Sequence, residues 1–174
     1  MKNIVIASVL STFALMTAPA QAGNSLLLET ATEQVALKVA REVAEGGYKL
    51  LAVKDLKDML DVKDDMVLID AHPKIERDLA YIEGAINIGF KSNRSASGKW
   101  EDDIEDGHSQ EAYRAALGPN LGKKIVIYCG FTKCGRSHNA AMWAKKMGYT
   151  NIYRVPGGMS AWMDAGYLYK TAIK

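Results

Sequence analysis

The sequence lacks an excess of charge of either sign. Its 22 lysines and arginines oppose 20 aspartates and glutamates, and the two signs are interspersed along the chain. Proteins that bind nucleic acid through electrostatics concentrate basic residues in a patch or run. The charge distribution therefore predicts no nucleic-acid partner.

Long apolar runs are missing after the first twenty residues. The one such run, at residues 4–18, follows Lys2 and precedes Ala20, Gln21 and Ala22, a small-x-small site where a signal peptidase can cut. This pattern is typical of a secretory signal peptide. A retained anchor is the alternative, but a membrane span needs about 20 apolar residues. We therefore expect residues 1–22 to be a signal peptide.

Cleavage at this site would leave a mature chain that begins at Gly23. Its 174 − 22 = 152 residues are a common size for one domain. No cysteine directly follows the cleavage site, so the mature chain would have no attachment point for a lipid there. The chain is therefore expected to be exported, periplasmic if its source is a Gram-negative bacterium, and not embedded in a membrane. We divide it into the signal peptide, a helical extension at 23–47 and a domain at 48–174.

Cysteine is scarce, since the chain contains only Cys129 and Cys134. In a protein that enters an oxidising compartment, a structural disulfide is the default expectation for such a pair. A zinc site that adds His138 is an alternative, but the spacing fits neither a Cys-x2-Cys pair nor a closed four-ligand site. The sequence therefore predicts no metal and no cofactor.

Apolar periodicity predicts an amphipathic helix at residues 30–45, ended by Gly46 and Gly47. It packs either on the core of its own domain or against a second copy or another protein. Strands are expected at 49–53, 66–70, 85–88, 124–129 and 151–155. Helices are expected at 54–60, 109–117 with Ser109 as N-cap, 136–147 and 159–165. Residues 91–108 have no apolar period and five acids, and are predicted to be a solvated surface loop.

This alternation predicts an α/β fold, in which a parallel sheet carries helices on both faces. Cys129 ends the most convincing strand, and a helix is expected to begin at Arg136. Reactive groups collect at such strand ends, because helix amino-termini present unpaired N–H groups and partial positive charge there. Two glycines of the intervening loop let backbone amides turn inward, and Lys133 and Arg136 add cations.

These features favour the thiolate of Cys129, which is the nucleophilic form of cysteine. They also suit an anionic sulfur donor such as thiosulfate, a polysulfide or a persulfide, because negative charge develops on the departing group. The expected acceptor is a thiol, sulfide or similar thiophile. The predicted substrate-binding residues are Gly130, Phe131, Thr132, Lys133, Cys134, Gly135 and Arg136.

Six blocks of sequence, in order and at fitting spacing, resemble the signature blocks of the rhodanese family. They are Val67-Leu68-Ile69-Asp70, Tyr81-Ile82-Glu83-Gly84-Ala85-Ile86-Asn87-Ile88, Ile125-Val126-Ile127-Tyr128-Cys129, Gly135-Arg136-Ser137, Gly148-Tyr149-x-Asn151-Ile152-Tyr153 and Gly157-Gly158-Met159-x-Ala161-Trp162. The resemblance implies a rhodanese-like fold with a five-stranded parallel sheet. It further implies that Cys129 takes up a sulfane sulfur as a persulfide, that loop amides cradle it, and that Arg136 helps to bind the donor.

The chain departs from the family pattern around the cysteine. Six residues separate Cys129 from Arg136, where the usual loop has four, so a wider pocket is expected. Ala71 and His72 replace an arginine that is common after the Ile-Asp pair. We expect Asp70 to organise loops, and His72 is a candidate to face the pocket.

The longer loop also contains Cys134, for which three roles are open. It resolves the Cys129 persulfide or receives its sulfur, it forms a disulfide with Cys129, or it is an inert thiol. The leading hypothesis for the whole protein is a sulfurtransferase. The alternatives are a sulfur carrier that binds a partner through the amino-terminal helix, and a thiol-disulfide redox protein that uses both cysteines.

Overall fold

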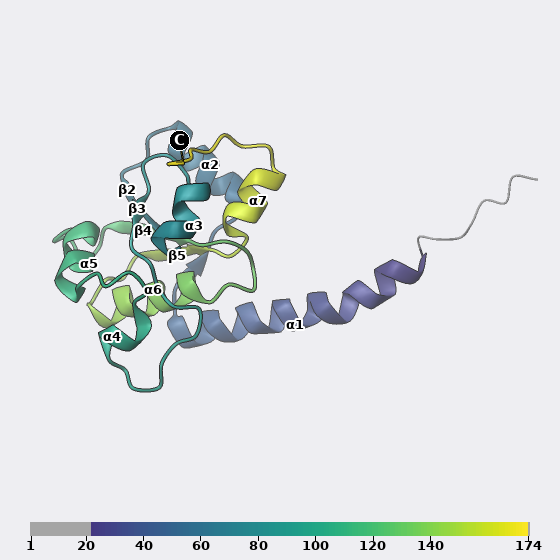
Figure 1. Ribbon diagram of the computed structural model, residues 1–174, viewed down its shortest axis with the longest axis horizontal. Coiled ribbons are helices and arrows are strands. Elements are labelled where there is room, and N and C mark those ends of the chain that lie inside the picture. Colours follow the sequence, from purple (N-terminus) through teal and green to yellow (C-terminus); the bar gives the residue numbers. More distant parts are fainter. Residues whose placement is uncertain (1–21, 174) are drawn as a thin grey trace, which may run out of the picture. The chain divides into compact units, whose positions relative to one another are not determined.

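The computed structural model describes residues 22–173, with side chains from Leu28 on (Figure 1). The predicted signal peptide lies outside the described residues except for Ala22. Of the described residues, 22–33 belong to one unit, and the remainder of α1 belongs to a second unit with the sheet and all other elements. The helices are α1 (Ala22–Gly46), α2 (Val53–Asp61), α3 (Lys74–Leu79), α4 (Trp100–Asp103), α5 (Gln110–Leu117), α6 (Arg136–Lys146) and α7 (Gly158–Asp164).

Five parallel strands form the sheet, in the order β1-β5-β4-β2-β3. They are β1 (Lys49–Leu50), β2 (Met66–Asp70), β3 (Ile86–Asn87), β4 (Lys124–Tyr128) and β5 (Ile152–Val155). The central strand β4 is in register with both neighbours, so that Ile127 pairs with Ile69 on one side and Arg154 on the other. The predicted five-stranded α/β fold is confirmed, although the edge strands are shorter than expected.

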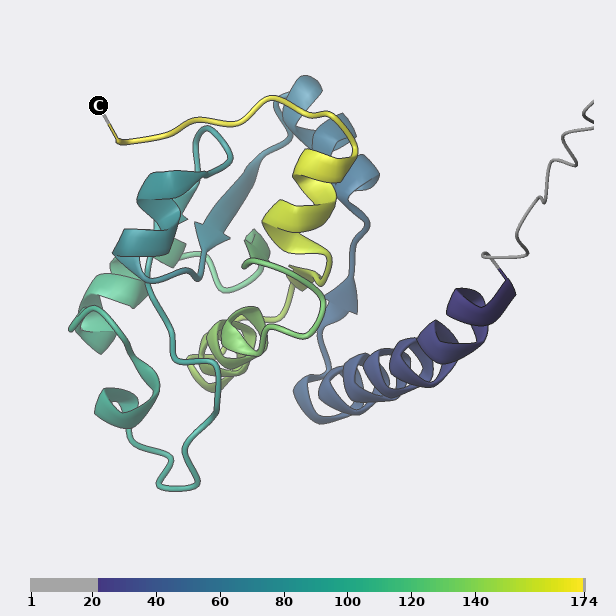
Figure 2. The ribbon, with the colours of Figure 1, turned by 45° about the vertical axis from the view of Figure 1, so that its right-hand side comes forward.

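Alternate residues of the strands fill two separate core layers. Ile125 and Ile127 of β4 point into one layer, with α4, α5 and α6, whereas Val126 and Tyr128 point into the other, with α2 and α7. Figure 2 shows α7 and α6 on opposite sides of the strands. Since both faces are covered, the strands read as continuous apolar runs. The predicted placement of helices on both faces is confirmed.

The prediction of a solvated loop at residues 91–108 is wrong. Helix α4 lies within it, Trp100 is buried between aromatic rings, and the Asp103 side chain is fully enclosed. An Asp103 oxygen accepts a hydrogen bond from the Trp143 indole at 2.9 Å, and the other accepts from the Ser95 amide at 2.6 Å. An apolar pattern cannot reveal a segment that is anchored by a tryptophan and a buried carboxylate.

Helix α3 was not predicted either. It has no buried residue, so it carries no apolar period to detect. By contrast, the predicted N-cap of α5 is present, because the Ser109 hydroxyl accepts the Ala112 amide at 3.1 Å. Among the described residues, no helix combines the length and the apolar character that a membrane span requires.

Candidate active site

Cys129 is the first residue after β4, at the carboxyl end of the central strand, and it is fully buried. Its carbonyl accepts the Met159 amide at 2.8 Å, which ties the strand end to the start of α7. Gly158 makes this close approach possible. Its φ is +55°, and a Cβ there would lie 1.9 Å from the Cys129 carbonyl oxygen. A side chain at residue 158 would therefore displace the Cys129 backbone.

The loop from Gly130 to Gly135 folds back so that Cys134 meets Cys129. The Cys129 Sγ lies 3.7 Å from the Cys134 carbonyl oxygen and 3.2 Å from the Ser137 Oγ. Both cysteines are free thiols. Phe131 is 51% exposed and Lys133 is also exposed, so these two predicted binding residues line the outside of the loop.

The surroundings shift the pKa values of the two thiols in opposite directions. Burial, followed by the contact with Cys134, raises the pKa of Cys129 well above its usual value. The hydrogen bond from Cys129 lowers the pKa of Cys134 to about 5, helped by the Gly130 and Arg136 amides and the Arg136 charge. Burial thus opposes the predicted Cys129 thiolate, whereas hydrogen bonds from Ser137 lower the pKa of Cys129 and favour it.

Arg136 opens α6, as predicted, but its guanidinium already has an anionic partner. Its Nη2 and Nη1 atoms donate to the two carboxylate oxygens of Glu76 at 3.0 and 3.2 Å. Nη1 also lies 3.9 Å from the Cys134 Sγ, and Nε is buried without a hydrogen-bond partner among the described residues. A carboxylate of α3 thus occupies the fork that would receive an anionic donor.

Ser137 and Arg154 approach Cys129 from behind the loop, and the sequence analysis missed both. The Ser137 Oγ lies 3.2 Å from the Cys129 Sγ and accepts a hydrogen bond from the Arg154 Nε at 2.8 Å. The Arg154 Nη2 donates to the Cys134 carbonyl at 3.0 Å. A single arginine in an otherwise apolar strand was the available signal, because such a charge must find buried partners.

The Arg154 charge is balanced by a residue of α1. Its Nη1 donates to a Glu42 carboxylate oxygen at 2.5 Å and to the Tyr48 hydroxyl at 3.2 Å. The Tyr48 hydroxyl also lies 2.9 Å from the His138 Nδ1. Burial opposes charge on the imidazole and lowers the pKa of His138. These contacts link the predicted amino-terminal extension to the backbone of the candidate site.

Asp70 and His72 lie where β2 ends, next to the loop. Asp70 is fully buried and accepts hydrogen bonds from the His72 Nδ1 and the Tyr128 hydroxyl, both at 2.7 Å. A neutral His72 therefore has its proton on Nδ1, which leaves Nε2 as an acceptor. This Nε2 would lie 3.1 Å from a Cβ at Gly130, so His72 does face the start of the loop.

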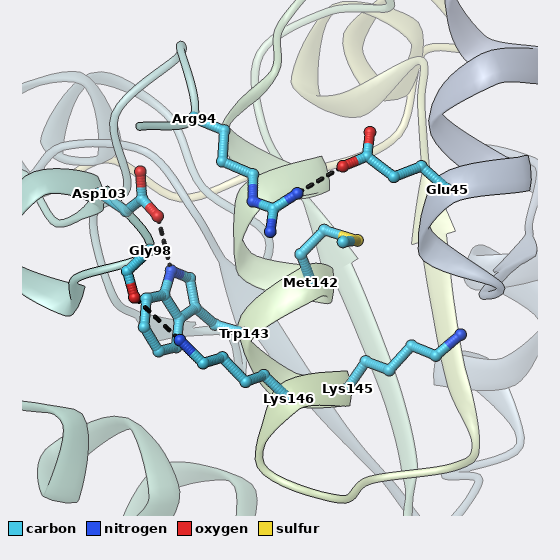
Figure 3. A pocket seen from close by; sticks show the side chains of 8 residues that line it. All are labelled: Glu45, Arg94, Gly98, Asp103, Met142, Trp143, Lys145 and Lys146. Atoms are coloured by element: carbon cyan, nitrogen blue, oxygen red, sulfur yellow. Dashed lines mark hydrogen bonds and ion pairs between the residues drawn. The ribbon is translucent and has the colours of Figure 1, made fainter. Parts of the chain in front are cut away.

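A separate pocket of about 240 Å³ lies beside α6 (Figure 3). The Lys146 ammonium stands over the Trp143 ring and donates to the Gly98 carbonyl at 2.9 Å, while Arg94 pairs with Glu45. Neither cysteine is among its lining residues. The pocket is therefore distinct from the site around Cys129.

Comparison with known families agrees with this geometry. The family model described as Rhodanese-like domain matches residues 52–165, which is more than half of the chain. The chain belongs to the rhodanese-like family. The matched region contains all the strands except β1, the loop with both cysteines, and Arg154.

Similar rhodanese-like proteins include sulfurtransferases. A thiosulfate:glutathione sulfurtransferase of Saccharomyces cerevisiae is 26% identical over 117 residues, which cover 65% of this chain and 76% of the relative. A thiosulfate sulfurtransferase structure from Pseudomonas aeruginosa has a TM-score of 0.56 at 19% identity, covering 76% of this chain but only 22% of its own. This chain thus spans about a fifth of that protein.

A polysulfide-sulfur transferase homodimer of Wolinella succinogenes has a TM-score of 0.55 at 18% identity. The match covers 83% of this chain and 93% of that one. At such identities the two solved structures show the fold, and the resemblance to rhodaneses found in the sequence is confirmed by the family match.

Proposed function

We propose that this rhodanese-like domain is a sulfurtransferase that carries sulfane sulfur on Cys129. The observation that supports this most strongly is the place of Cys129, at the end of the central parallel strand and facing the loop that leads into α6. Backbone amides at such an edge stabilise negative charge on a sulfur. The same place holds the reactive cysteine that the family resemblance implies.

The transfer proceeds in two displacements. The Cys129 sulfur loses its proton as it attacks the outer sulfur of thiosulfate, a polysulfide or a persulfide, and the donor S–S bond breaks with its electron pair leaving on the donor remainder. Cys129 then holds a persulfide. A thiol, sulfide, sulfite or cyanide attacks the outer sulfur, the new S–S bond breaks, and the Cys129 thiolate is released.

Cys134 supplies the base for the first displacement. Because the resting pair has its negative charge on Cys134 and a proton on Cys129, the Cys129 proton passes to Cys134 as the Cys129 sulfur attacks. The loop folds back so that the Cys129 Sγ contacts the Cys134 backbone, which brings this base next to the nucleophile. This role explains how a fully buried thiol becomes a nucleophile.

Turnover with thiosulfate or polysulfide and a cyanide acceptor tests the proposal. Release of thiocyanate by the reduced wild-type protein, abolished in Cys129→Ser, is the expected result. Activity that persists in Cys129→Ser, or absence of activity with every donor, would overturn it.

A thiol-disulfide redox protein is the second candidate, favoured by the loop that brings the Cys134 backbone to 3.7 Å from the Cys129 Sγ. In that case Cys134→Ser abolishes all activity, because no disulfide can form within the chain. In a sulfurtransferase the same variant still accepts one sulfur on Cys129, although more slowly.

A sulfur carrier that docks through α1 is the third candidate. Leu37 of α1 is 47% exposed, which leaves an apolar contact for a protein partner or a second copy of the chain. Leu37→Glu would then abolish co-purification with the partner, whereas a sulfurtransferase that needs no partner keeps its turnover in this variant.

A further inference from the structure

Arg154 is the largest fully buried side chain of the described residues. An arginine charge enclosed in protein is costly unless it is paired and its N–H groups are bonded. Here the guanidinium donates to four groups, on α1, before β1, in the active-site loop and on α6. Simple packing in a sheet requires none of these contacts, since an apolar residue would fill a central strand with less penalty.

The direction of one of these bonds determines where the Ser137 proton lies. The Arg154 Nε–H donates to the Ser137 oxygen, so the hydroxyl proton is free to point elsewhere. The Cys129 Sγ lies 3.2 Å away and accepts this proton when its sulfur is anionic. The Arg154 Nη2 donates to the Cys134 carbonyl oxygen, which lies 3.7 Å from the Cys129 Sγ. Without this hydrogen bond, the partial negative charge of the oxygen would repel an anionic sulfur.

We propose that Arg154 is a positioning residue for Cys129, which turns the Ser137 hydroxyl toward the sulfur and stabilises its anionic forms. The inference rests on the proposed function, in which Cys129 is negative as a thiolate and as a persulfide. Arg154 acts through Ser137 and through the Cys134 carbonyl, and it touches no reacting atom itself.

Glu42 opposes this effect. Its carboxylate pairs with Arg154 at 2.5 Å, so it neutralises part of the positive charge that Cys129 would otherwise sense. Although burial raises the pKa of Glu42, its hydrogen bonds from Lys38 and Arg154 lower it overall, so Glu42 is charged at neutral pH. Helix α1 thereby adjusts the electrostatics of a cysteine that lies 87 residues later in the chain (129 − 42).

Other charged or titratable groups surround the same sulfur and must stay constant in any test. Cys134 lies beside the sulfur in the loop and Arg136 beside Cys134, Tyr48 and His138 lie on the Arg154 side, and the Asp70–His72 pair faces Gly130. Replacing Cys134 by serine leaves Cys129 as the only thiol of the chain, because there are two cysteines in total. The ultraviolet absorbance of the thiolate then reports Cys129 alone.

The test compares Arg154→Gln with Glu42→Gln in this Cys134→Ser protein. Loss of the guanidinium charge should raise the pH midpoint of the Cys129 titration by about one unit, a tenfold loss of thiolate at a fixed pH below the midpoint. Loss of the opposing carboxylate should lower the midpoint. Arg114→Gln, whose guanidinium contacts the Met147 carbonyl instead, is the control that should leave it unchanged.

The two variants are expected to shift the Cys129 midpoint in opposite directions, and this distinguishes a positioning role from a purely structural one. If Arg154 and Glu42 only held the fold together, both variants would shift the midpoint in the same direction or not at all, and either result overturns the inference. If Arg154→Gln does not fold, Glu42→Gln and Ser137→Ala still decide the question. Ser137→Ala should raise the midpoint and reduce the effect of Glu42→Gln by at least half.

Failure of the sulfurtransferase proposal can be distinguished from failure of the Arg154 inference. A wild-type protein that accepts no sulfur from any donor contradicts the sulfurtransferase proposal, while the Cys129 midpoints still measure the influence of Arg154. Normal sulfur uptake with unmoved midpoints contradicts the Arg154 inference alone.

Discussion

Cys134 changes the character of the reactive residue. The two buried cysteines titrate as a coupled pair, in which burial raises the pKa of Cys129 and the Cys129 thiol lowers the pKa of Cys134. The sequence predicted a nucleophile and located it at the strand end. It left three roles open for Cys134, because the choice between them depends on how a six-residue loop folds back.

Removal of Cys134 should therefore slow sulfur uptake and move it to higher pH. In the wild-type protein Cys134 loses its proton near pH 5, so the base is already present at neutral pH. The rate of sulfur uptake should therefore be constant across neutral pH. In Cys134→Ser, Cys129 must lose its own proton to water, and uptake should rise steeply between about pH 7 and 10. Stopped-flow uptake rates from a polysulfide donor measure both profiles. Identical profiles would exclude Cys134 as the base.

Glu76 is expected to select against strongly anionic donors. Its carboxylate occupies both ends of the Arg136 guanidinium, so a dianion must displace it or bind beside a like charge. Glu76→Gln should raise kcat/KM for thiosulfate, a dianion, by about three- to tenfold, and for methanethiosulfonate, a monoanion, by less than about twofold. Glu83→Gln, an exposed carboxylate that faces Lys170, is the matched control. Equal gains with both donors would contradict this role.

At the scale of elements, strands were predicted well and the site-bearing helices less completely. Buried parallel strands such as β2 and β4 appear in the sequence as unbroken apolar runs, so their bounds follow from composition. Helices α3 and α4 have few apolar residues, yet they supply Glu76 and Asp103. Their positions depend on long-range polar contacts that no local period records.

Helix α4 is held by a buried carboxylate, which predicts a large stability effect. Asp103→Ala removes the acceptor of the buried Trp143 indole and of the partly buried Ser95 amide. The free energy of unfolding should fall by about 2–4 kcal/mol in a urea titration. Glu101→Gln, on the exposed side of the same helix, should change it by less than about 0.5 kcal/mol. Similar small effects for both variants would mean that α4 is not anchored through Asp103.

At the scale of the whole molecule, we propose that the chain is exported and cleaved after Ala22. The early cation, the apolar run and the small-x-small site support this proposal. Expression with the native amino terminus in a Gram-negative host should give a periplasmic protein whose intact mass corresponds to residues 23–174. A cytoplasmic protein that retains residues 1–22 would contradict it.

Helix α1 begins next to the proposed cleavage site and contributes a residue to the contacts around the candidate active site. The part of α1 from Gln34 on contributes Glu42 and a buried Val39 to the unit that contains the sheet. The apolar period of residues 30–45 predicts only a helical extension at 23–47. Its link to the reactive cysteine could not be foreseen, because Glu42 and Arg154 are far apart in the chain and are joined only by the fold.

The location of the transferred sulfur tests the central claim most directly. Trypsin cleaves after Lys133 and so separates Cys129 and Cys134 into different peptides. After brief incubation of the reduced protein with a polysulfide and alkylation, mass spectrometry should find one added sulfur on the peptide of residues 125–133, and none there in Cys129→Ser. An added sulfur found only on Cys134, or on neither peptide, would contradict the account.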